Sequence, residues 1–189
     1  MQNSKNKLYV ISGSSGVGKG TVIKGFLEKN PEFSLSISYT TREKRDGEED
    51  GVNYFFVTKE DFLQGVRNDE FLEWAEFSEN YYGTKKAYVE KCLNKGKDLI
   101  LEIETQGALQ IKKKMPEAVL IFIAPPSYDD LEFRLRNRNT ESEEAIQKRL
   151  DFVKMEIENS KYYDYKIVND ELEDAIIELE RIIKNERLY

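Results

Sequence analysis

The stretch that decides the fold reads Gly13-Ser14-Ser15-Gly16-Val17-Gly18-Lys19-Gly20-Thr21. It follows the short apolar run Leu8–Ile11 and precedes a helical pattern that begins at Val22. A glycine-rich loop between a strand and a helix can turn its amides inward around phosphate oxygens, and the helix adds the positive end of its dipole. Lys19 would bring a mobile positive charge to the β and γ phosphates of a nucleotide. The stretch therefore predicts a phosphate-binding loop, or P-loop.

The loop departs from the usual G-x-x-x-x-G-K-[ST] pattern at its end. Gly20 stands where Ser or Thr is expected, and Thr21 comes one position later. The hydroxyl that commonly contacts Mg²⁺ directly is therefore missing, and Thr21 is a candidate for a contact through water. The alternative is a glycine-rich turn that binds nothing, and the flanking strand, the flanking helix and Lys19 argue against it.

The composition excludes several classes of protein. The chain has 189 residues, enough for one domain with a sizeable core, and it contains no histidine. Catalytic triads with histidine and histidine-bearing zinc sites are therefore excluded, and a bound metal is expected to be a hard cation on oxygen ligands. The net charge of −7 argues against a nucleic-acid coat or a membrane-surface protein, so we expect neither nucleic acid nor membrane as a partner.

Three features bear on location. Cys92 is the single cysteine, which rules out an internal disulfide and favours a reducing cytosol. The first residues lead directly into a strand, so we expect no signal peptide. The longest uninterrupted apolar run, residues 118–124, is too short to span a bilayer. We therefore expect a cytoplasmic protein.

Apolar periodicity predicts the order of the elements, and capping residues predict three helix starts: Thr58 with Asp61, Ser127 with Asp130, and Thr140 with Glu143. Helices are expected over about residues 19–30, 58–68, 87–95, 106–115, 127–137, 140–161 and 171–185, and strands over residues 35–38, 54–57, 71–77, 98–102, 118–124 and 165–168. The outer parts alternate strand and helix, which predicts a parallel sheet covered on both faces. Residues 34–84 break that rhythm with short strands and polar turns. The fold class is therefore α/β, with a P-loop core and a small α+β insert.

A phosphorylated acceptor would need a second anion site, and the insert holds candidates for it. Arg42 and Arg45 are three positions apart in a glycine-bearing loop, and two guanidinium groups can clamp one phosphate. Tyr54 and Tyr82 could each donate a hydroxyl to the same phosphate. For the two arginines alone, a solvated charged loop is the more ordinary interpretation.

Glu73 is a carboxylate inside the otherwise apolar run Phe71–Ala75. Guanine presents two donors, N1–H and the 2-amino group, and one carboxylate can accept both, whereas adenine presents an acceptor at N1. Such a bidentate base contact discriminates by about 1–3 kcal/mol. The hydroxyls of Ser38 and Thr84 could donate to O6 of guanine. Taken alone, Glu73 would be interpreted as a solubility charge on an edge strand.

Several ordered motifs together resemble the guanylate kinases, a family of nucleoside monophosphate kinases, along nearly the whole chain. The motifs that carry the resemblance are residues 12–21, 38–48, 51–56, 71–75, 80–84, 106–107, 123–127, 134–140 and 167–170. The resemblance implies a P-loop three-layer fold with a core (residues 1–33, 85–126 and 162–189), a GMP-binding insert (34–84) and a helical lid (about 127–161). It also implies ATP-dependent phosphorylation of GMP, and of dGMP, to the diphosphate, with Mg²⁺ as cofactor, in purine metabolism and GMP recycling.

The resemblance assigns roles to individual residues. ATP would be held by Gly13, Ser14, Ser15, Gly16, Val17, Gly18, Lys19, Gly20, Thr21 and Asn169, the last near adenine. The GMP phosphate would be held by Arg42, Arg45, Glu48, Tyr54 and Tyr82, and guanine by Ser38, Glu73, Thr84 and Glu104. Glu104 and Glu102 both stand where the family pattern has Asp. Glu102 is at the Walker-B-like position, from which it would reach Mg²⁺ through water.

The lid would supply arginines to the transferring phosphoryl group. Arg134 and Arg138 are four positions apart and would share a helix face, and Arg149 follows in the next helix. With Lys19 they would form the catalytic set and neutralise charge on the equatorial oxygens. No catalytic base is required, because the GMP phosphate is already an anionic nucleophile with a second pKa of about 6. Locally, the arginines could instead complement a helix dipole.

Three functions are compatible with these motifs. The first is an ATP:GMP phosphotransferase with ATP and GMP as its partners, acting as a monomer or homodimer. The second is a guanylate-kinase-like module that binds protein partners without catalysis, against which Lys19 and the lid arginines argue. The third is a P-loop kinase for another phosphorylated acceptor.

Overall fold

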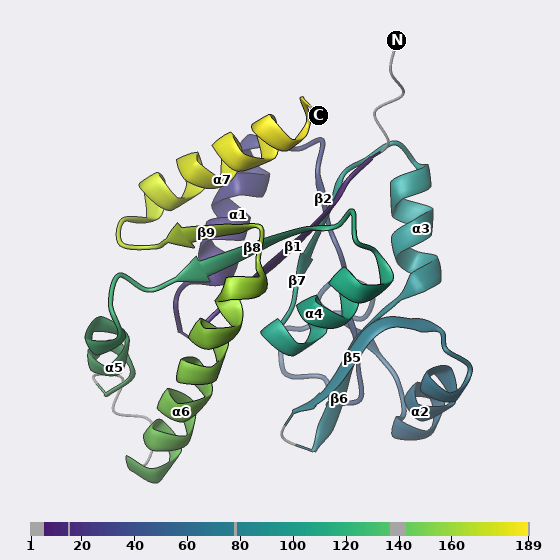
Figure 1. Ribbon diagram of the computed structural model, residues 1–189. Helices are drawn as coiled ribbons and strands as arrows, with labels where there is room; N and C mark the ends of the chain where they lie inside the picture. Colours follow the sequence, from purple (N-terminus) through teal and green to yellow (C-terminus); the bar gives the residue numbers. More distant parts are fainter. Residues whose placement is uncertain (1–5, 15, 78, 137–142, 189) are drawn as a thin grey trace. The chain divides into compact units, whose positions relative to one another are not determined.

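The computed structural model describes residues 6–14, 16–77, 79–136 and 143–188, and its architecture is α/β (Figure 1). A five-stranded sheet has the order β2-β7-β1-β8-β9, and a four-stranded sheet has the order β4-β3-β6-β5. In the larger sheet, β2 pairs with β7 and β8 with β9 in parallel. This confirms the predicted α/β class with a parallel core sheet.

The chain divides into two compact units. The first unit comprises the described residues within Ile11–Pro31 and from Val119 onward. The second comprises the described residues within 6–10 and Glu32–Ala118. Strand β1, Leu8–Gly13, contributes residues to both. The division into core, insert and lid stays a prediction.

The first unit carries the P-loop and the C-terminal part of the chain from Val119 onward. Its strands β8 and β9 run in register from the pair Ile121–Tyr165 to the pair Ala124–Val168. Helix α7 packs on β9 and on α1, and α5 packs on α6 through a small apolar core around Leu150 and Val153 (Figure 1). Besides the end of β1, its elements are α1 (Lys19–Lys29), β8 (Val119–Ala124), α5 (Tyr128–Arg136), α6 (Glu143–Asn159), the 3-10 turn η1 (Ser160–Tyr162), β9 (Tyr165–Val168) and α7 (Leu172–Glu186).

The second unit carries the smaller sheet. Strands β5 and β6 form its antiparallel hairpin, with a register shift between Phe71 and Glu73, and β5 is an edge strand. Helix α4 packs on β5. Besides the start of β1, its elements are β2 (Ser34–Leu35), β3 (Tyr39–Thr40), β4 (Phe55–Phe56), α2 (Lys59–Arg67), β5 (Phe71–Phe77), β6 (Asn80–Lys85), α3 (Lys86–Asn94), β7 (Leu99–Glu102) and α4 (Thr105–Lys114).

One strand expected from the sequence is wrong, and one strand of the structure was not predicted. The single strand expected over residues 35–38 is instead two short strands that belong to different sheets, Ser34–Leu35 beside β7 and Tyr39–Thr40 between β4 and β6. Strand β6 was not expected, because its residues are polar or aromatic without clear alternation. Its pairing with β3 and β5 decides its conformation instead.

The capping residues behave as expected. Thr58 Oγ1 accepts a hydrogen bond from Asp61 N–H at 3.1 Å at the start of α2. Ser127 Oγ accepts one from Asp130 N–H at 3.0 Å at the start of α5. Thr140, the cap expected for the next helix, lies outside the described residues. Local capping chemistry therefore set these two helix starts.

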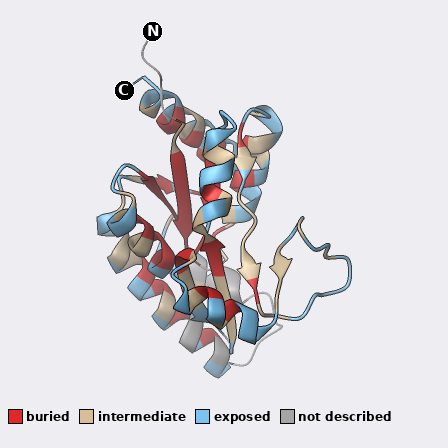
Figure 2. Ribbon diagram, turned by 90° about the vertical axis from the view of Figure 1, so that its right-hand side faces the viewer, coloured by how far each residue is buried: buried red, intermediate tan, exposed pale blue. Residues whose placement is uncertain are grey.

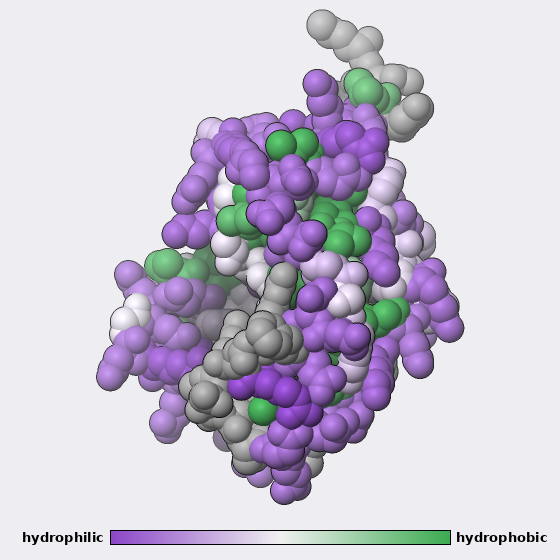
Figure 3. Space-filling view, turned by 90° about the vertical axis from the view of Figure 1, so that its left-hand side faces the viewer, coloured by the Kyte–Doolittle hydropathy of each residue, from purple (hydrophilic) through white to green (hydrophobic). Residues whose placement is uncertain are grey.

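The apolar runs of the sequence form the buried strands, and hydrophilic residues dominate the surface. Strands β1 and β8 are buried along their whole length and are drawn in red in Figure 2. The face shown in Figure 3 is dominated by hydrophilic side chains, and its apolar side chains form small separate groups. None of the helices in the described part of the chain is long and apolar enough to cross a bilayer.

Candidate functional site

The P-loop of the first unit has the conformation that its glycines permit. Gly16 and Gly18 have φ angles of 85° and 88°, in the left-handed region that glycine adopts most readily. Val17 N–H donates to the Ser14 carbonyl at 3.0 Å, which closes the loop. A Cβ on Gly13 would lie 2.4 Å from the Ile123 carbonyl oxygen, so only glycine fits there.

The loop ends at the N-terminus of α1, where Lys19 is the first helical residue. Gly18 occupies the N-cap position, and no side chain caps the helix within the described residues. The positive end of the helix dipole therefore faces the loop without a capping carboxylate or hydroxyl. Ser14 is 2% exposed, and its hydroxyl has no hydrogen-bond partner in the described part of the chain. Such an arrangement suits a ligand with phosphate oxygens.

Asn169 connects the loop to the segment that follows β9. It directly follows β9, and its backbone N–H donates to the Ala124 carbonyl at 2.9 Å. Its Nδ2 donates to the Val17 carbonyl at 2.7 Å, and this bond is buried. A Cβ on Gly18 would lie 2.9 Å from the same nitrogen. Asn169 thus holds the P-loop, and its expected contact with adenine stays a prediction.

The remaining residues of the loop and the expected lid are placed less completely. Gly20 and Thr21 are exposed in the first turn of α1, and Ser15 lies outside the described residues. Arg134 lies on α5 and Arg149 on α6, but their side chains are outside the description, as is Arg138 entirely. Their catalytic roles therefore stay predictions.

The arginine loop of the second unit is organised around Glu48. One Glu48 oxygen accepts a hydrogen bond from the Arg42 guanidinium at 2.7 Å, and the other accepts one from Arg45 N–H at 2.9 Å. The Arg42 side chain is only 14% exposed, so the interpretation as a fully solvated charged loop does not hold for it. These contacts lower the pKa of Glu48, the Arg42 bond most, and Glu48 therefore stays ionised.

Two tyrosines face this arginine. The Arg42 guanidinium carbon lies 5.5 Å from the centre of the Tyr54 ring, and the Tyr54 and Tyr82 ring centres are 6.1 Å apart. Burial is the main cause that raises the pKa of Tyr54; the neighbouring phenol of Tyr82 adds to that rise, and the positive charge of Arg42 opposes it. Arg42, Tyr54 and Tyr82 are thus brought together, as an anion site would require.

Glu73 is buried on β5 opposite Thr84 of β6. It is 4% exposed, which excludes its interpretation as a surface solubility charge. Thr84 Oγ1 donates to Glu73 Oε1 at 2.7 Å. Burial raises the pKa of Glu73 to about 7, and the hydrogen bonds from Thr84 and the charge of Lys114 oppose that rise. The site therefore holds a carboxylate that would gain from further donors.

The candidate anion site around Arg42 and the candidate base site around Glu73 share one face of the smaller sheet. Tyr82 and Thr84 are two positions apart on β6, so their side chains point to the same face. Ser38 precedes β3, and its carbonyl accepts from Phe55 N–H at 2.9 Å. Glu104 is exposed at the N-cap of α4. The candidate anion site and the candidate base site are therefore neighbours in this unit.

Sequence reasoning missed two residues next to Glu73. A Cβ on Gly107 would lie 2.6 Å from Glu73 Oε2, and the Gln110 amide contacts the backbone of Trp74. The sequence signals at Gly107 are a glycine inside a predicted helix, which usually has a packing reason, and the family motif at residues 106–107, but neither assigns a role to Gly107 or Gln110.

In the described part of the chain, no group of three or more His, Cys, Asp or Glu side chains is arranged so that it could hold a metal ion. Thr21 of the first unit and Glu102 of the second are each exposed, and each offers the kind of oxygen donor that suits Mg²⁺, an ion that keeps several waters and binds largely through substrate phosphates.

Comparisons with known proteins agree with one another. A family model described as guanylate kinase matches residues 5–186. The guanylate kinase of Oceanobacillus iheyensis is 48% identical over 100% of this chain and 91% of its own, and that of Carboxydothermus hydrogenoformans is 50% identical over 97% and 90%. The crystal structure of guanylate kinase from Anaplasma phagocytophilum has a TM-score of 0.80 and 34% identity, and the match covers 100% of this chain and 90% of that one. The similarity therefore runs along almost the whole chain.

Proposed function

The chain belongs to the guanylate kinase family, and on that premise we propose how its residues phosphorylate GMP to GDP with ATP. The reaction is a phosphoryl transfer. An oxygen of the GMP phosphate attacks the γ phosphorus of ATP, the bond from that phosphorus to the β,γ-bridging oxygen breaks, and ADP leaves with the electron pair. Such a step needs positioning and charge neutralisation more than covalent help from the protein.

The P-loop is assigned to ATP. Its backbone amides and the uncapped N-terminus of α1 would bind the phosphates. Lys19 would neutralise the negative charge that develops on the β,γ-bridging oxygen as the bond breaks. Asn169 supports this role, because its 2.7 Å bond to the Val17 carbonyl restrains the peptide whose N–H belongs to Gly18. The arginines Arg134, Arg138 and Arg149 would neutralise the equatorial oxygens.

The smaller sheet of the second unit is assigned to GMP. Arg42, Arg45, Tyr54 and Tyr82 would bind its phosphate, with Glu48 orienting the Arg42 guanidinium and bonding the backbone N–H of Arg45. Glu73 would accept N1–H and the 2-amino group of guanine, with Ser38, Thr84 and Glu104 beside it. The observation that carries this assignment is the burial of Glu73, because a buried carboxylate with few donors is stabilised by a base that supplies two.

Mg²⁺ would be held through ATP and water, with Glu102 and Thr21 as the nearest protein oxygens in this scheme. When bound, the ion supplies charge neutralisation on the phosphates. The chain's own contribution is to leave room for its waters, which the small Gly20 at the end of the loop favours.

The cellular setting follows from the substrates. ATP and GMP are cytosolic metabolites, and the single cysteine, Cys92, suits a reducing compartment. We therefore place the enzyme in the cytoplasm, in purine metabolism and GMP recycling, with dGMP as the second acceptor that the family resemblance implies.

A panel of acceptors tests the proposal. ADP release from ATP is measured with GMP, dGMP, AMP, CMP and a sugar phosphate as acceptor. We expect turnover with GMP and dGMP and little with the others. Turnover with another acceptor alone would assign the P-loop to a different kinase reaction, and no turnover combined with phosphopeptide binding would favour a protein-binding module.

A further inference from the structure

The open edge of β5 is covered by side chains of α4. An edge strand has no neighbouring strand on one side, so its N–H and C=O groups need other partners. Gln110 Nε2 donates to the Trp74 carbonyl at 2.8 Å, and Trp74 N–H donates to Gln110 Oε1 at 3.3 Å. The amide of Gln110 therefore pairs with Trp74 as the backbone of an adjacent strand would.

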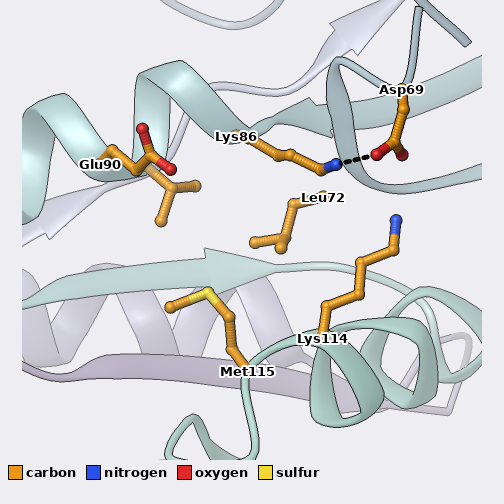
Figure 4. A pocket seen from close by; sticks show the side chains of 7 residues that line it. Asp69, Leu72, Lys86, Glu90, Lys114 and Met115 are labelled. Atoms are coloured by element: carbon orange, nitrogen blue, oxygen red, sulfur yellow. Dashed lines mark hydrogen bonds and ion pairs between the residues drawn. The ribbon is translucent and has the colours of Figure 1, made fainter.

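A second side chain, one turn further along α4, also binds the backbone of β5. Lys114 Nζ donates to the Phe71 carbonyl at 3.1 Å. Its ammonium group also points toward the ion pair of Asp69 and Lys86 at the edge of a cavity of about 410 Å³ (Figure 4). Two points of the β5 backbone are thus fixed to one helix, on either side of Glu73 in the sequence.

Gly107 allows α4 to approach this closely. It is three positions before Gln110 and seven before Lys114, a spacing that places all three on one helix face. The 2.6 Å between its ideal Cβ and Glu73 Oε2 means that any side chain would force the carboxylate to move. Thr84 holds the other carboxylate oxygen from the opposite strand.

We propose that Gly107 and Gln110 are positioning residues that set the preference of this enzyme for guanine. Gln110 fixes the backbone next to Glu73, and Gly107 leaves the space in which its Oε2 lies. The inference rests on the proposed role of Glu73 as guanine acceptor. A carboxylate that is displaced or tilted cannot accept from both N1–H and the 2-amino group with good geometry.

Inosine monophosphate (IMP) separates this role from a merely structural one. Its base keeps N1–H but lacks the 2-amino group, so its contact with Glu73 uses one donor instead of two. Misplacing the carboxylate should therefore cost GMP more than IMP. The measured quantity is the ratio of kcat/KM for GMP to kcat/KM for IMP.

The test uses Gln110→Met, which keeps the length of the side chain and removes both hydrogen bonds, and Gly107→Ala. We expect the ratio to fall about tenfold in each, the scale of one lost hydrogen bond, with the KM for ATP within about twofold of wild type. Gln110→Glu keeps the acceptor for Trp74 N–H but sets a carboxylate oxygen against the Trp74 carbonyl, so the ratio should fall at least as far as in Gln110→Met. Lys113→Ala, at an exposed position of the same helix, is the matched control and should leave the ratio unchanged.

The outcomes separate this inference from the proposed function. If the wild type turns over GMP but both variants keep its ratio, whether their activity is unchanged or falls equally for GMP and IMP, only the positioning role is overturned. Absence of GMP-dependent turnover in the wild type would overturn the proposed function and this inference together. Thermal melts show whether each variant is folded, and if Gly107→Ala is not, the two Gln110 variants decide.

Discussion

Glu73 shows at the scale of one residue how burial tunes a ligand-binding group. Its carboxyl group has a pKa of about 7 because burial removes water from the charged form, and the hydrogen bonds from Thr84 only partly offset that cost. Guanine donors would lower this pKa again, because they favour the ionised form. Binding of GMP should therefore be coupled to loss of a proton from Glu73.

The first prediction concerns pH. GMP affinity should fall as pH drops below about 7, by up to tenfold per pH unit, because the protonated carboxyl group cannot accept both guanine donors. The GMP phosphate titrates in the same range, so titration calorimetry should compare wild type with Glu73→Gln from pH 5.5 to 8.5. The variant should bind more weakly at high pH and lose the part of the slope due to Glu73. Parallel pH profiles would contradict the assignment.

The second prediction concerns Lys19. Lys19→Ala should lower kcat about a hundredfold or more while changing the KM for GMP much less, because the lysine is assigned to the transferring phosphate. Steady-state kinetics with both substrates varied measures the two effects. Lys24→Ala, at an exposed position on the same helix, is the control. Near-normal turnover in Lys19→Ala would remove this lysine from the mechanism.

Helices α5 and α6 show what the element scale adds to the arginine cluster. Arg136 Nε donates to Glu132 Oε1 at 2.8 Å, and its NH1 donates to Glu143 Oε1 at 2.6 Å. These bonds connect α5 to the first turn of α6, where the acidic side chain also suits the helix dipole. Arg136 is thus committed to a structural contact, although the sequence presents it in the same cluster as the proposed catalytic arginines.

The third prediction follows from this difference. Arg134→Ala should lower kcat about a hundredfold or more, and Arg136→Ala should leave kcat within about twofold, because an exposed ion pair contributes little. The measurement is kcat at saturating ATP and GMP, with a thermal melt of each variant. A larger loss in Arg136→Ala than in Arg134→Ala would reverse the two roles.

At the scale of the whole molecule, the reaction requires the two nucleotides to meet. The P-loop belongs to the first unit and Glu73 to the second. In-line transfer brings the γ phosphorus of ATP within bonding distance of a GMP oxygen, and water must be excluded at that moment. The proposed mechanism therefore requires that both halves act on one bound pair of substrates.

The fourth prediction tests this requirement. A bisubstrate compound that links adenosine and guanosine through a phosphate chain should bind 10²-fold to 10⁴-fold more tightly than either nucleotide, since its second contact is intramolecular. Calorimetry with the wild type measures the gain. Lys19→Ala and Glu73→Gln should each remove part of it. Affinity no better than that of ATP alone would mean that the two halves do not share a substrate pair.

Prediction from sequence succeeded where the signal was local. The strand, glycine loop and helix around Lys19 are as predicted, and so are the caps at Thr58 and Ser127. It failed where distant residues decide the outcome. Strand β6 depends on partners in β3 and β5, and Gln110 contacts Trp74 across 36 positions in the chain.

The sequence by itself determined the family, the α/β class and the residue types of both halves of the candidate site, because glycine spacing, capping and apolar periodicity act over a few neighbouring residues. Only the tertiary structure decided that Glu73 is buried, that Glu48 holds the arginine loop, and that Gly107 and Gln110 of α4 lie against β5. Burial and cross-strand contacts depend on which distant segments pack together, and it is this packing that gives Glu73 a pKa of about 7.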